Sequence, residues 1–276
     1  MGMCKTSELL SEAKSRKICV PAFNVYSYES IKWTLDVAQE LDRPVIVMTW
    51  QGVARYMPLS AIAALTKELA KDVTVPVALH LDHSYSFEDA MLGVKYGFSS
   101  IMYDGSKLPL EENIKNTAEV AKAAHAVGVE VEGELGHVGL GSDLGGCTFT
   151  VPDEAVRFAN ETGVEALAVS IGNAHGVYSS TPDLQLDLLK ELAGVVPCPL
   201  VLHGGSGIPA AQVRQAIGIG ITKMNIATDF WAAMDDAVYA AHEKGKHNHF
   251  YTMLEAREPF KDFLRSRFEM LVGEEK

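Results

Sequence analysis

Three of the nine histidines follow short apolar segments, in positions where their imidazoles could hold a metal ion. His83 and His203 end segments 75–83 and 199–203, and His175 comes shortly after segment 166–172. Three histidines with an open fourth position form the ligand set of a catalytic zinc ion. A lone histidine in such a place is usually a hydrogen-bonded rim residue, and no short motif links the three. The zinc site is therefore predicted only if the fold brings the three segment ends together.

The elements that must position these histidines are short, apolar, β-branched segments that alternate with stretches of helical periodicity. Segments so apolar are expected to be buried on both faces, as in a parallel sheet. Eight of them, without a linker-like boundary, predict one α/β domain over residues 1–276: a closed (β/α)8 barrel with a C-terminal helical segment. An open doubly wound sheet is the alternative. The expected strands are 18–25, 44–50, 75–83, 99–104, 129–135, 166–172, 199–203 and 221–226, and the clearest helices are 31–41, 62–71, 111–127 and 154–162.

Further polar residues end the expected strands, and barrels of this kind carry their active sites at the C-terminal ends of the strands. The sequence therefore predicts a single site that collects side chains from most of the strands. His80, which shares the side-chain parity of Asp82, is interpreted as a packing residue beneath that site. The strand-end residues are Asn24, Asp82, Asp104, Glu132, Glu134, Asn225 and Thr228.

The glycine-rich turn after the seventh expected strand is a candidate phosphate site. Glycine lets the backbone approach a ligand closely, and N–H groups at a strand-to-helix turn can bind phosphate without a basic side chain. The loops after strands seven and eight are the usual phosphate site of this fold. A tight turn without a ligand is the alternative. The residues expected around the phosphate are Gly204, Gly205, Ser206, Asn225, Ile226, Ala227 and Thr228.

Composition narrows the class of partner. The chain carries 24 basic and 36 acidic residues and a net charge of −12, so nucleic acid and anionic membranes are not expected partners. No apolar run reaches the ~20 residues needed to span a bilayer, and the first residues lack the apolar core of a secretory signal. The four cysteines show no C-x-x-C spacing. A cytoplasmic protein with reduced thiols is predicted.

Two segments interrupt the alternation of strands and helices. Residues 137–150 form a long glycine-rich connection, of a kind that is usually functional or mobile. Residues 229–276 are mostly helical, and apolar residues recur on one face of this segment. This face indicates either a subunit contact in a homodimer or homotetramer, or packing against the chain's own barrel. The residues concerned are Phe260, Phe263, Leu264, Phe268 and Leu271.

Seven motifs, taken in their order along the chain, resemble the class II ketose-bisphosphate aldolases, especially the tagatose-bisphosphate branch. Each motif is moderately specific, and the ordered set is highly specific. The resemblance runs from Pro21 to about Thr228. The motifs are PAFNV (21–25), HLDH (80–83), SSIMYDGS (99–106), VEGELG (131–136), SIGNAHGVY (170–178), VLHGGSGIP (201–209) and KMNIATD (223–229).

The resemblance implies the chemistry of the site. His83, His175 and His203 would hold a zinc ion that acts as a Lewis acid on dihydroxyacetone phosphate. Asp82 would transfer the proton at the hydroxyl of the aldehyde-derived half of the substrate, and Asn24 would touch the same end.

The remaining implied roles concern a second cation and the phosphate-bearing half of the substrate. Asp104 and Glu134 resemble positions that can hold a second metal ion or a monovalent cation. Dihydroxyacetone phosphate, the small sugar phosphate expected as ligand, would lie against Gly176, Gly204, Gly205, Ser206, Asn225, Ile226, Ala227 and Thr228.

One departure from the family pattern concerns proton transfer. In the family an acid in the loop after the fifth strand is thought to move the proton on the dihydroxyacetone phosphate carbon. Here that position is Ser142, and its neighbour Asp143 is the predicted substitute. The same loop opens with His137, where arginine or a small residue is more usual.

Other departures concern the substrate. Ala227 resembles the tagatose branch and argues against strict use of fructose 1,6-bisphosphate. The C-terminal arginine that usually contacts the distal phosphate is missing, and Phe250 lies near its expected place, with Arg55 or Arg257 as candidates to compensate. The sequence therefore does not determine whether the distal group of the substrate is a phosphate.

The predicted function is metal-dependent, reversible cleavage of a ketose 1-phosphate or 1,6-bisphosphate to dihydroxyacetone phosphate and an aldehyde. One alternative is an aldolase whose substrate ends in a carboxylate or a longer sugar chain. Another is a non-catalytic sugar-phosphate-binding protein, against which Asp82 beside three histidines argues. A Schiff-base aldolase would need a lysine, and the strand candidate, Lys223, is expected at the wrong end of the barrel.

Overall fold

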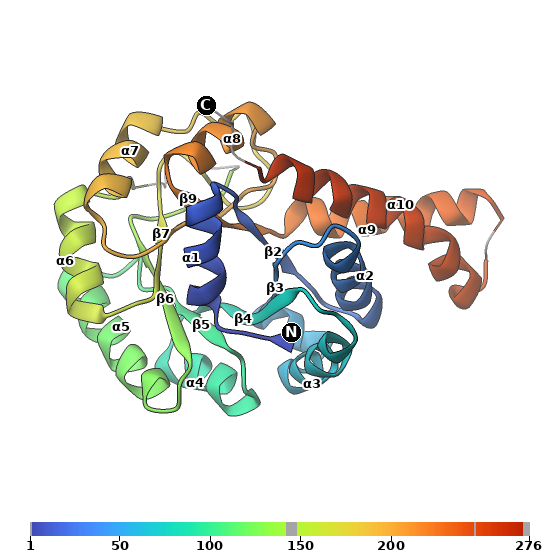
Figure 1. The fold of residues 1–276 in the computed structure, drawn as a ribbon, viewed down its shortest axis with the longest axis horizontal. Coiled ribbons are helices and arrows are strands. Elements are labelled where there is room, and N and C mark those ends of the chain that lie inside the picture. The colour runs from blue at the N-terminus through green and yellow to red at the C-terminus, as the bar shows by residue number, and fades with distance from the viewer. Residues whose placement is uncertain (1, 142–147, 246, 273–276) are drawn as a thin grey trace.

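The computed structural model describes residues 2–141, 148–245 and 247–272, and its central feature is a closed barrel of eight parallel strands (Figure 1). β2 pairs with both β3 and β9, and the pairing of β4 with β5 closes the ring. The predicted barrel is confirmed, with strand ends shifted by a few residues. The barrel strands are β2 (Val20–Asn24), β3 (Val45–Trp50), β4 (Pro76–Ser84), β5 (Ser100–Tyr103), β6 (Glu130–Leu135), β7 (Ala166–Val169), β8 (Leu200–Leu202) and β9 (Ile221–Ile226).

Helices surround the barrel, and the four predicted ones are present with earlier starts. Apolar periodicity misses the polar first turn, which local capping determines: at α2 the Ser27 hydroxyl accepts from the N–H of Ser30, whose own hydroxyl accepts from the N–H of Ser27. The helices are α1 (Thr6–Arg16), α2 (Tyr28–Glu40), α3 (Leu59–Leu69), α4 (Phe87–Tyr96), α5 (Leu110–His125), α6 (Pro152–Thr162), α7 (Leu186–Val195), α8 (Ala210–Ile219), α9 (Thr228–Glu243) and α10 (His249–Met270), with short 3-10 turns at Gln51–Arg55 and Ala70–Asp72 and a two-residue strand β1 (Gly2–Met3).

The first helix closes one end of the barrel. Leu9, Leu10 and Ala13 of α1 are buried against inward-facing residues of the strands, such as Val20 and Ile46. Figure 1 shows α1 crossing the front of the barrel in that view. A separate and larger apolar layer lies between the strands and the outer helices. Because α1 covers the N-terminal ends of the strands, a ligand can reach the barrel interior only from the C-terminal ends.

The last two helices pack on each other, and α10 also packs on α2 (Figure 1). Four members of the apolar face described above are at most 1% exposed within this single chain: Phe260, Leu264, Phe268 and Leu271. That face therefore covers the chain's own barrel, which was one of the two predicted uses. It gives no support to a subunit contact, and oligomerisation stays a prediction. None of the described helices is both long and apolar enough to cross a membrane.

Candidate active site

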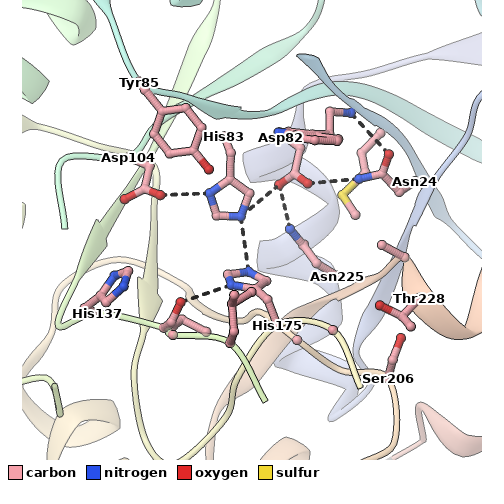
Figure 2. Close-up of a pocket in the computed structure, with 18 of the residues that line it drawn as sticks. Asn24, Asp82, His83, Tyr85, Asp104, His137, His175, Ser206, Asn225 and Thr228 are labelled. Carbon is pink, nitrogen blue, oxygen red and sulfur yellow. Dashed lines mark hydrogen bonds and ion pairs between the residues drawn. The ribbon is translucent and has the colours of Figure 1, made fainter. Parts of the chain in front are cut away.

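The C-terminal ends of the strands surround a cavity of about 390 Å³ (Figure 2). Most of the site residues expected from the sequence come together here. His203 and Glu134 lie fully buried beside this group rather than on the cavity wall. The expected residues that line the cavity are Asn24, Asp82, His83, Asp104, His175, Gly176, Gly204, Ser206, Asn225, Ala227 and Thr228.

One extra residue in β4 turns two consecutive side chains toward the cavity. Neighbouring residues of a strand normally face opposite sides, but the register between β4 and β5 shifts between Leu81 and Ser84. His83, inside this β-bulge, has a φ of 42°, which is costly for a residue other than glycine. Bulges re-aim side chains in this way. Asp82 and His83 therefore both face the cavity, which a regular strand would not allow.

In two of the three histidines, one ring nitrogen faces a hydrogen-bond acceptor and the other ring nitrogen points toward the other histidines. His83 Nδ1 lies 3.0 Å from Oδ2 of Asp104. His175 Nδ1 lies 3.1 Å from the backbone oxygen of Val138. Because an ionised carboxylate and a carbonyl oxygen can only accept, these Nδ1 atoms carry protons. The Nε2 atoms of both rings are then left to face each other at 3.2 Å.

The third histidine is turned the other way round. His203 Nε2 lies 2.9 Å from Oε1 of Glu132, so this nitrogen carries the proton and Nδ1 faces inward. The amide nitrogen of Asn225 also lies 3.1 Å from His203 Nε2, but it is 3.0 Å from Asp82 as well, to which it donates. The orientation of all three rings is therefore fixed by neighbours that accept a hydrogen bond from a ring N–H group.

The inward nitrogens form a set that fits a divalent metal ion. His83 Nε2 lies 3.2 Å from His175 Nε2 and 3.1 Å from His203 Nδ1, and all three atoms lie within 4.8 Å of one another. Nitrogen ligands about 2.0–2.1 Å from a tetrahedral zinc ion are roughly 3.3 Å apart. Each ring is also oriented by an outer acceptor, as metal-bound histidines usually are. The donor set and its spacing therefore suit zinc.

The charges around the histidines favour one extra proton in the metal-free protein. Burial alone would lower the pKa of His83, but the carboxylates of Asp82, Asp104 and Glu134 outweigh it and raise that pKa to about 9. Burial and the charge on His83 lower the pKa of the other two histidines. A proton on His83 Nε2 can then be shared with the two inward nitrogens that face it. A metal ion bound to the three inward nitrogens would displace this proton.

A second group of ligands adjoins the first and shares His83. Ligand atoms of His83, Asp104 and Glu134 lie within 4.8 Å of one another. The Oε2 atom of Glu134 is buried and has no hydrogen-bond partner among the described residues. Burial, followed by the charge of Asp104, raises the pKa of Glu134 to about 8. An orphaned carboxylate oxygen of this kind is what a bound cation would satisfy.

Asp82 is a buried base beside the histidines. It is 5% exposed, and each of its oxygens accepts from an amide group, one from Asn24 and one from Asn225, both at 3.0 Å. Burial raises its pKa above the usual value, which His83 opposes. Its Oδ1 lies 3.9 Å from Nε2 of His83. A substrate hydroxyl next to a carbonyl held at the histidines would therefore lie within reach of this carboxylate.

The opposite side of the cavity is made of backbone turns. Gly204 has a φ of 62°, and an added Cβ would lie 1.9 Å from the backbone oxygen of Ala174, so only glycine fits. The hydroxyl of Ser206 accepts from the N–H of Asp229 in the first turn of α9, which begins at Thr228. A helix N-terminus beside a glycine turn attracts anions. This side is suited to a phosphate group.

Two expected site residues do not line the cavity, and a third lies outside the described residues. The N–H of Gly205 donates to the backbone oxygen of Asn225 at 3.1 Å, and Gly205 does not line the cavity. The side chain of Ile226 is 1% exposed and belongs to the apolar layer between strands and helices. Asp143, together with Ser142, lies outside the described residues.

The described ends of the 137–150 connection lie over the histidines. Backbone bridges join His137 to Thr148 and Leu140 to His175. His137 and Lys107 line the cavity on this side, and Nδ1 of His137 lies 3.1 Å from the hydroxyl of Ser106. The described residues at the start of this connection thus form part of the wall of the cavity.

Sequence reasoning missed an ion pair beneath the site. Lys223 and Glu132 are at most 1% exposed, and the Lys223 ammonium donates to Glu132 Oε2 at 2.7 Å while Oε1 faces His203. Lys223 does not line the cavity, so a Schiff-base role finds no support. The available signal was parity: Lys223 and Asn225 are two residues apart on β9 and face the same side.

Sequence reasoning also missed a group of large side chains on the cavity wall. Met48, Trp50, Tyr85 and Trp231 line it beside the polar residues. Polar strand ends were the only signal used; Met48, Trp50 and Trp231 are not catalytic types, and Tyr85 lies beyond the end of β4. The position of Trp50 follows from register, because Trp50 is paired with Asp82 across β3 and β4.

The (β/α)8 fold and the polar, histidine-rich cavity at the C-terminal ends of the strands place this chain among the barrel enzymes. The family described as "Fructose-bisphosphate aldolase class-II" matches residues 4–276, and the chain belongs to this family. It is therefore an aldolase, a lyase that acts on carbon–carbon bonds.

Solved structures agree with this assignment. The YdjI aldolase from Escherichia coli K12 is 32% identical, with a TM-score of 0.89 over 98% of this chain and 97% of that one. A fructose-bisphosphate aldolase from Campylobacter jejuni is 27% identical, with a TM-score of 0.83 over 98% and 95%. A putative fructose-1,6-bisphosphate aldolase from Coccidioides immitis is 25% identical, with a TM-score of 0.85 over 97% and 96%.

Proposed function

We propose that this aldolase cleaves a ketose 1-phosphate or 1,6-bisphosphate, reversibly and with a bound zinc ion, to dihydroxyacetone phosphate and an aldehyde. The observation that carries the proposal is the convergence of three imidazole nitrogens beside a buried carboxylate, Asp82. Ala227, which resembles the tagatose-bisphosphate branch, stands in the cavity wall. A sugar-phosphate-binding protein without activity would have no use for such a base.

The protein's own residues divide the reaction into two parts. Zinc, when bound by His83, His175 and His203, supplies a Lewis acid that stabilises negative charge on the substrate carbonyl. Asp82 removes the proton from the hydroxyl on the carbon that becomes the aldehyde, and the amide groups of Asn24 and Asn225 hold its carboxylate in place.

The phosphate of the dihydroxyacetone half would lie between the Gly204–Ser206 turn and the start of α9. Gly176, Asn225, Ala227 and Thr228 complete that side of the cavity. Gly205 and Ile226 would act through the backbone conformation of the turn and of β9 rather than by direct contact. Asp143 would move the proton on the dihydroxyacetone phosphate carbon.

Further parts of the proposal concern the surroundings of the site. Asp104 and Glu134, with His83, would hold a second metal ion or a monovalent cation. A cytoplasmic location, one domain over the whole chain and a homodimer or homotetramer remain predictions.

The direct test is release of dihydroxyacetone phosphate from a panel of ketose phosphates, measured with and without EDTA. We expect EDTA to abolish cleavage and added zinc to restore it, because three imidazole nitrogens converge beside Asp82, and Lys223, the strand lysine considered for an imine, does not line the cavity. Cleavage that survives complete chelation would refute the zinc mechanism. Zinc binding without cleavage of any panel member would favour the binding-protein alternative.

Zinc binding should release close to one proton at pH 7. The pKa of His83 is raised to about 9, so this ring is protonated in the metal-free protein and must lose its proton to bind the metal. The apparent zinc affinity should therefore rise about tenfold per pH unit below pH 9. Calorimetric titrations in buffers of different ionisation enthalpy measure the proton directly. A heat that does not depend on the buffer would contradict the expected protonation state.

Glu132→Gln should weaken zinc binding roughly 10- to 100-fold. The amide oxygen can satisfy Lys223, but the amide NH2 then faces His203 and favours the tautomer with its proton on Nδ1, the nitrogen that faces the metal site. Competition with a chromophoric chelator measures the affinity. Glu130→Gln is the matched control, because Glu130 is a buried glutamate of the same strand that contacts Ser7 instead. Equal affinities of the two variants would exclude this role for Glu132.

A further inference from the structure

Two tryptophans, Trp50 and Trp231, line the cavity and hydrogen-bond to Asn24, which Figure 2 shows on the side of Asp82 away from His83. Trp50 and Asp82 are register partners in the parallel pairing of β3 with β4, so their side chains leave the sheet on the same side. Trp231, in the first turns of α9, lines the same cavity. We call Trp50 and Trp231 the tryptophan wall.

Neighbouring groups hold both rings of the tryptophan wall. An added Cβ at Gly52 would lie 2.0 Å from the ring of Trp50, so this ring rests against the Gly52 backbone. The indole N–H of Trp231 donates to the backbone oxygen of Asn24 at 2.8 Å. The backbone N–H of Trp50 donates to the Oδ1 atom of Asn24 at 3.2 Å. Since Asn24 also donates to Asp82, the wall and the base are tied to one residue.

A second cavity lies against the other part of this wall, because Trp231 lines it as well. A space of about 280 Å³ is lined by Tyr26, Val53, Tyr56, Trp231 and Asp235. Trp231 belongs to both cavities, and the rings of Tyr26 and Tyr56 meet edge to face at 6.2 Å. Aromatic surface of this kind offers large contact area to a hydroxylated chain while the phenol groups can hydrogen-bond to it.

No lysine or arginine among the described residues lines this region. The one that lines the main cavity, Lys107, follows β5 beside His137, and Figure 2 shows His137 across His83 from Asn24. The only charged side chain of the second cavity is that of Asp235. An anionic group there would meet a carboxylate and no counter-charge, within a chain of net charge −12.

Neither candidate for a distal phosphate contact reaches these cavities. Arg257 and Phe250 line a different cavity, between α2 and α10. Arg55 is exposed and lines neither the main nor the second cavity.

From these observations we propose that the aldehyde half of the substrate is an uncharged, hydroxyl-bearing carbon chain that packs on the tryptophan wall. The inference rests on the proposed function, in which Asp82 acts on the hydroxyl of the future aldehyde carbon and the phosphate lies at the Gly204–Ser206 turn. Carbons beyond that hydroxyl must then pass Asp82 toward its register partner, Trp50. The substrate class is accordingly a ketose 1-phosphate with a neutral distal end, rather than a bisphosphate or a sugar acid.

The test is run in the condensation direction, with zinc-loaded enzyme and dihydroxyacetone phosphate as the common donor. Erythrose and erythrose 4-phosphate form a pair of acceptors that differ by the distal phosphoryl group, and their concentrations are compared as free aldehyde, because only erythrose can close to a furanose. We expect kcat/KM for erythrose to exceed that for erythrose 4-phosphate at least about tenfold. A preference for the phosphorylated acceptor would overturn the inference.

Variants of the wall separate packing from chemistry. Trp50→Ala, and Gly52→Ala, which displaces the same ring, should each raise the KM for erythrose about tenfold. Trp50→Phe should restore most of this loss. Trp50→Arg should reduce the discrimination against erythrose 4-phosphate. Tyr239→Ala removes an exposed aromatic residue of α9 outside both cavities and is the matched control.

A second readout keeps this inference distinct from the proposed function. Exchange of the dihydroxyacetone phosphate carbon-bound hydrogen with D2O requires no aldehyde, so every wall variant should retain it within about threefold. If exchange persists while erythrose 4-phosphate is preferred, the inference is wrong and the proposed function stands. If the native enzyme shows neither zinc-dependent exchange nor condensation, the proposed function fails, and the inference with it.

Discussion

Asp82→Asn is expected to lower the rate of ketose-phosphate cleavage about 10²- to 10⁴-fold, the range for loss of a general base. The new amide has nearly the same shape. The Oδ1 atom of Asn225 has no hydrogen-bond partner in the described part of the chain, so its amide can rotate to accept a hydrogen bond from the substituted side chain. The fold and the three histidines should therefore be preserved, and zinc affinity should change little. Steady-state cleavage assays and a zinc competition titration measure the two quantities.

The position of Asp82 in the reaction gives this variant a distinctive signature. Because Asp82 acts on the aldehyde half, the variant should still exchange the hydrogen of dihydroxyacetone phosphate with solvent. Asp143→Ala should lose exchange, and its cleavage should fall as well, because dihydroxyacetone phosphate is released only after the same carbon has been protonated. Were cleavage and exchange to fall together in Asp82→Asn, the division of labour between these two acids would be incorrect.

Apolar periodicity was sufficient to predict the barrel because parallel strands buried on both faces have few alternatives. Every strand of the barrel falls on a predicted segment. The observed strand ends differ from the predicted ones because pairing with the neighbouring strand determines where a strand stops. β7, for example, ends at Val169, before the turn that carries His175. The first helix was not assigned, since its role depends on Leu9 and Leu10 meeting the inside of the barrel rather than on any local motif.

The site was predicted as a collection of strand ends, and this worked because parallel strands share one C-terminal edge. What could not be predicted was the direction of each side chain. Asp82 and His83 are adjacent and would face opposite sides in a regular strand, and only the bulge with φ of 42° at His83 brings both inward. The amino-acid sequence of segment 75–83 contains no signal that indicates this bulge.

Contacts between strands that are distant in the sequence could not be predicted either. Trp50 lines the site because it is the register partner of Asp82, and Lys223 is buried because Glu132 lies opposite it across the barrel. From sequence alone, a lysine near the start of a strand is interpreted as lying away from the site, because its buried partner is not known. The apolar face at Phe260 and Leu264 shows the same limit, since periodicity marks a face that must be covered without saying by what.

His175→Ala is expected to weaken zinc binding at least about 100-fold, because the loss of a ligand should exceed the 10- to 100-fold cost of losing an outer partner. Among the three histidines, His175 is the most exposed, and its Nδ1 lies 3.1 Å from the backbone oxygen of Val138. Its removal leaves one unpaired carbonyl, so the metal-free variant should remain folded. Cleavage should fall to background at zinc concentrations that saturate the native protein.

Thermal unfolding gives a measurement of this loss that does not depend on activity. Zinc at 100 times its dissociation constant stabilises a folded protein by about 2.7 kcal/mol, which for a chain of this size corresponds to a rise in Tm of roughly 5–10 °C. The native protein should show this rise and His175→Ala should not at the same zinc concentration. His137→Ala is the matched control, because His137 lines the same cavity yet lies outside the three-histidine set. An undiminished rise in His175→Ala would mean that the metal is held elsewhere, and the proposed mechanism would lose its electron sink.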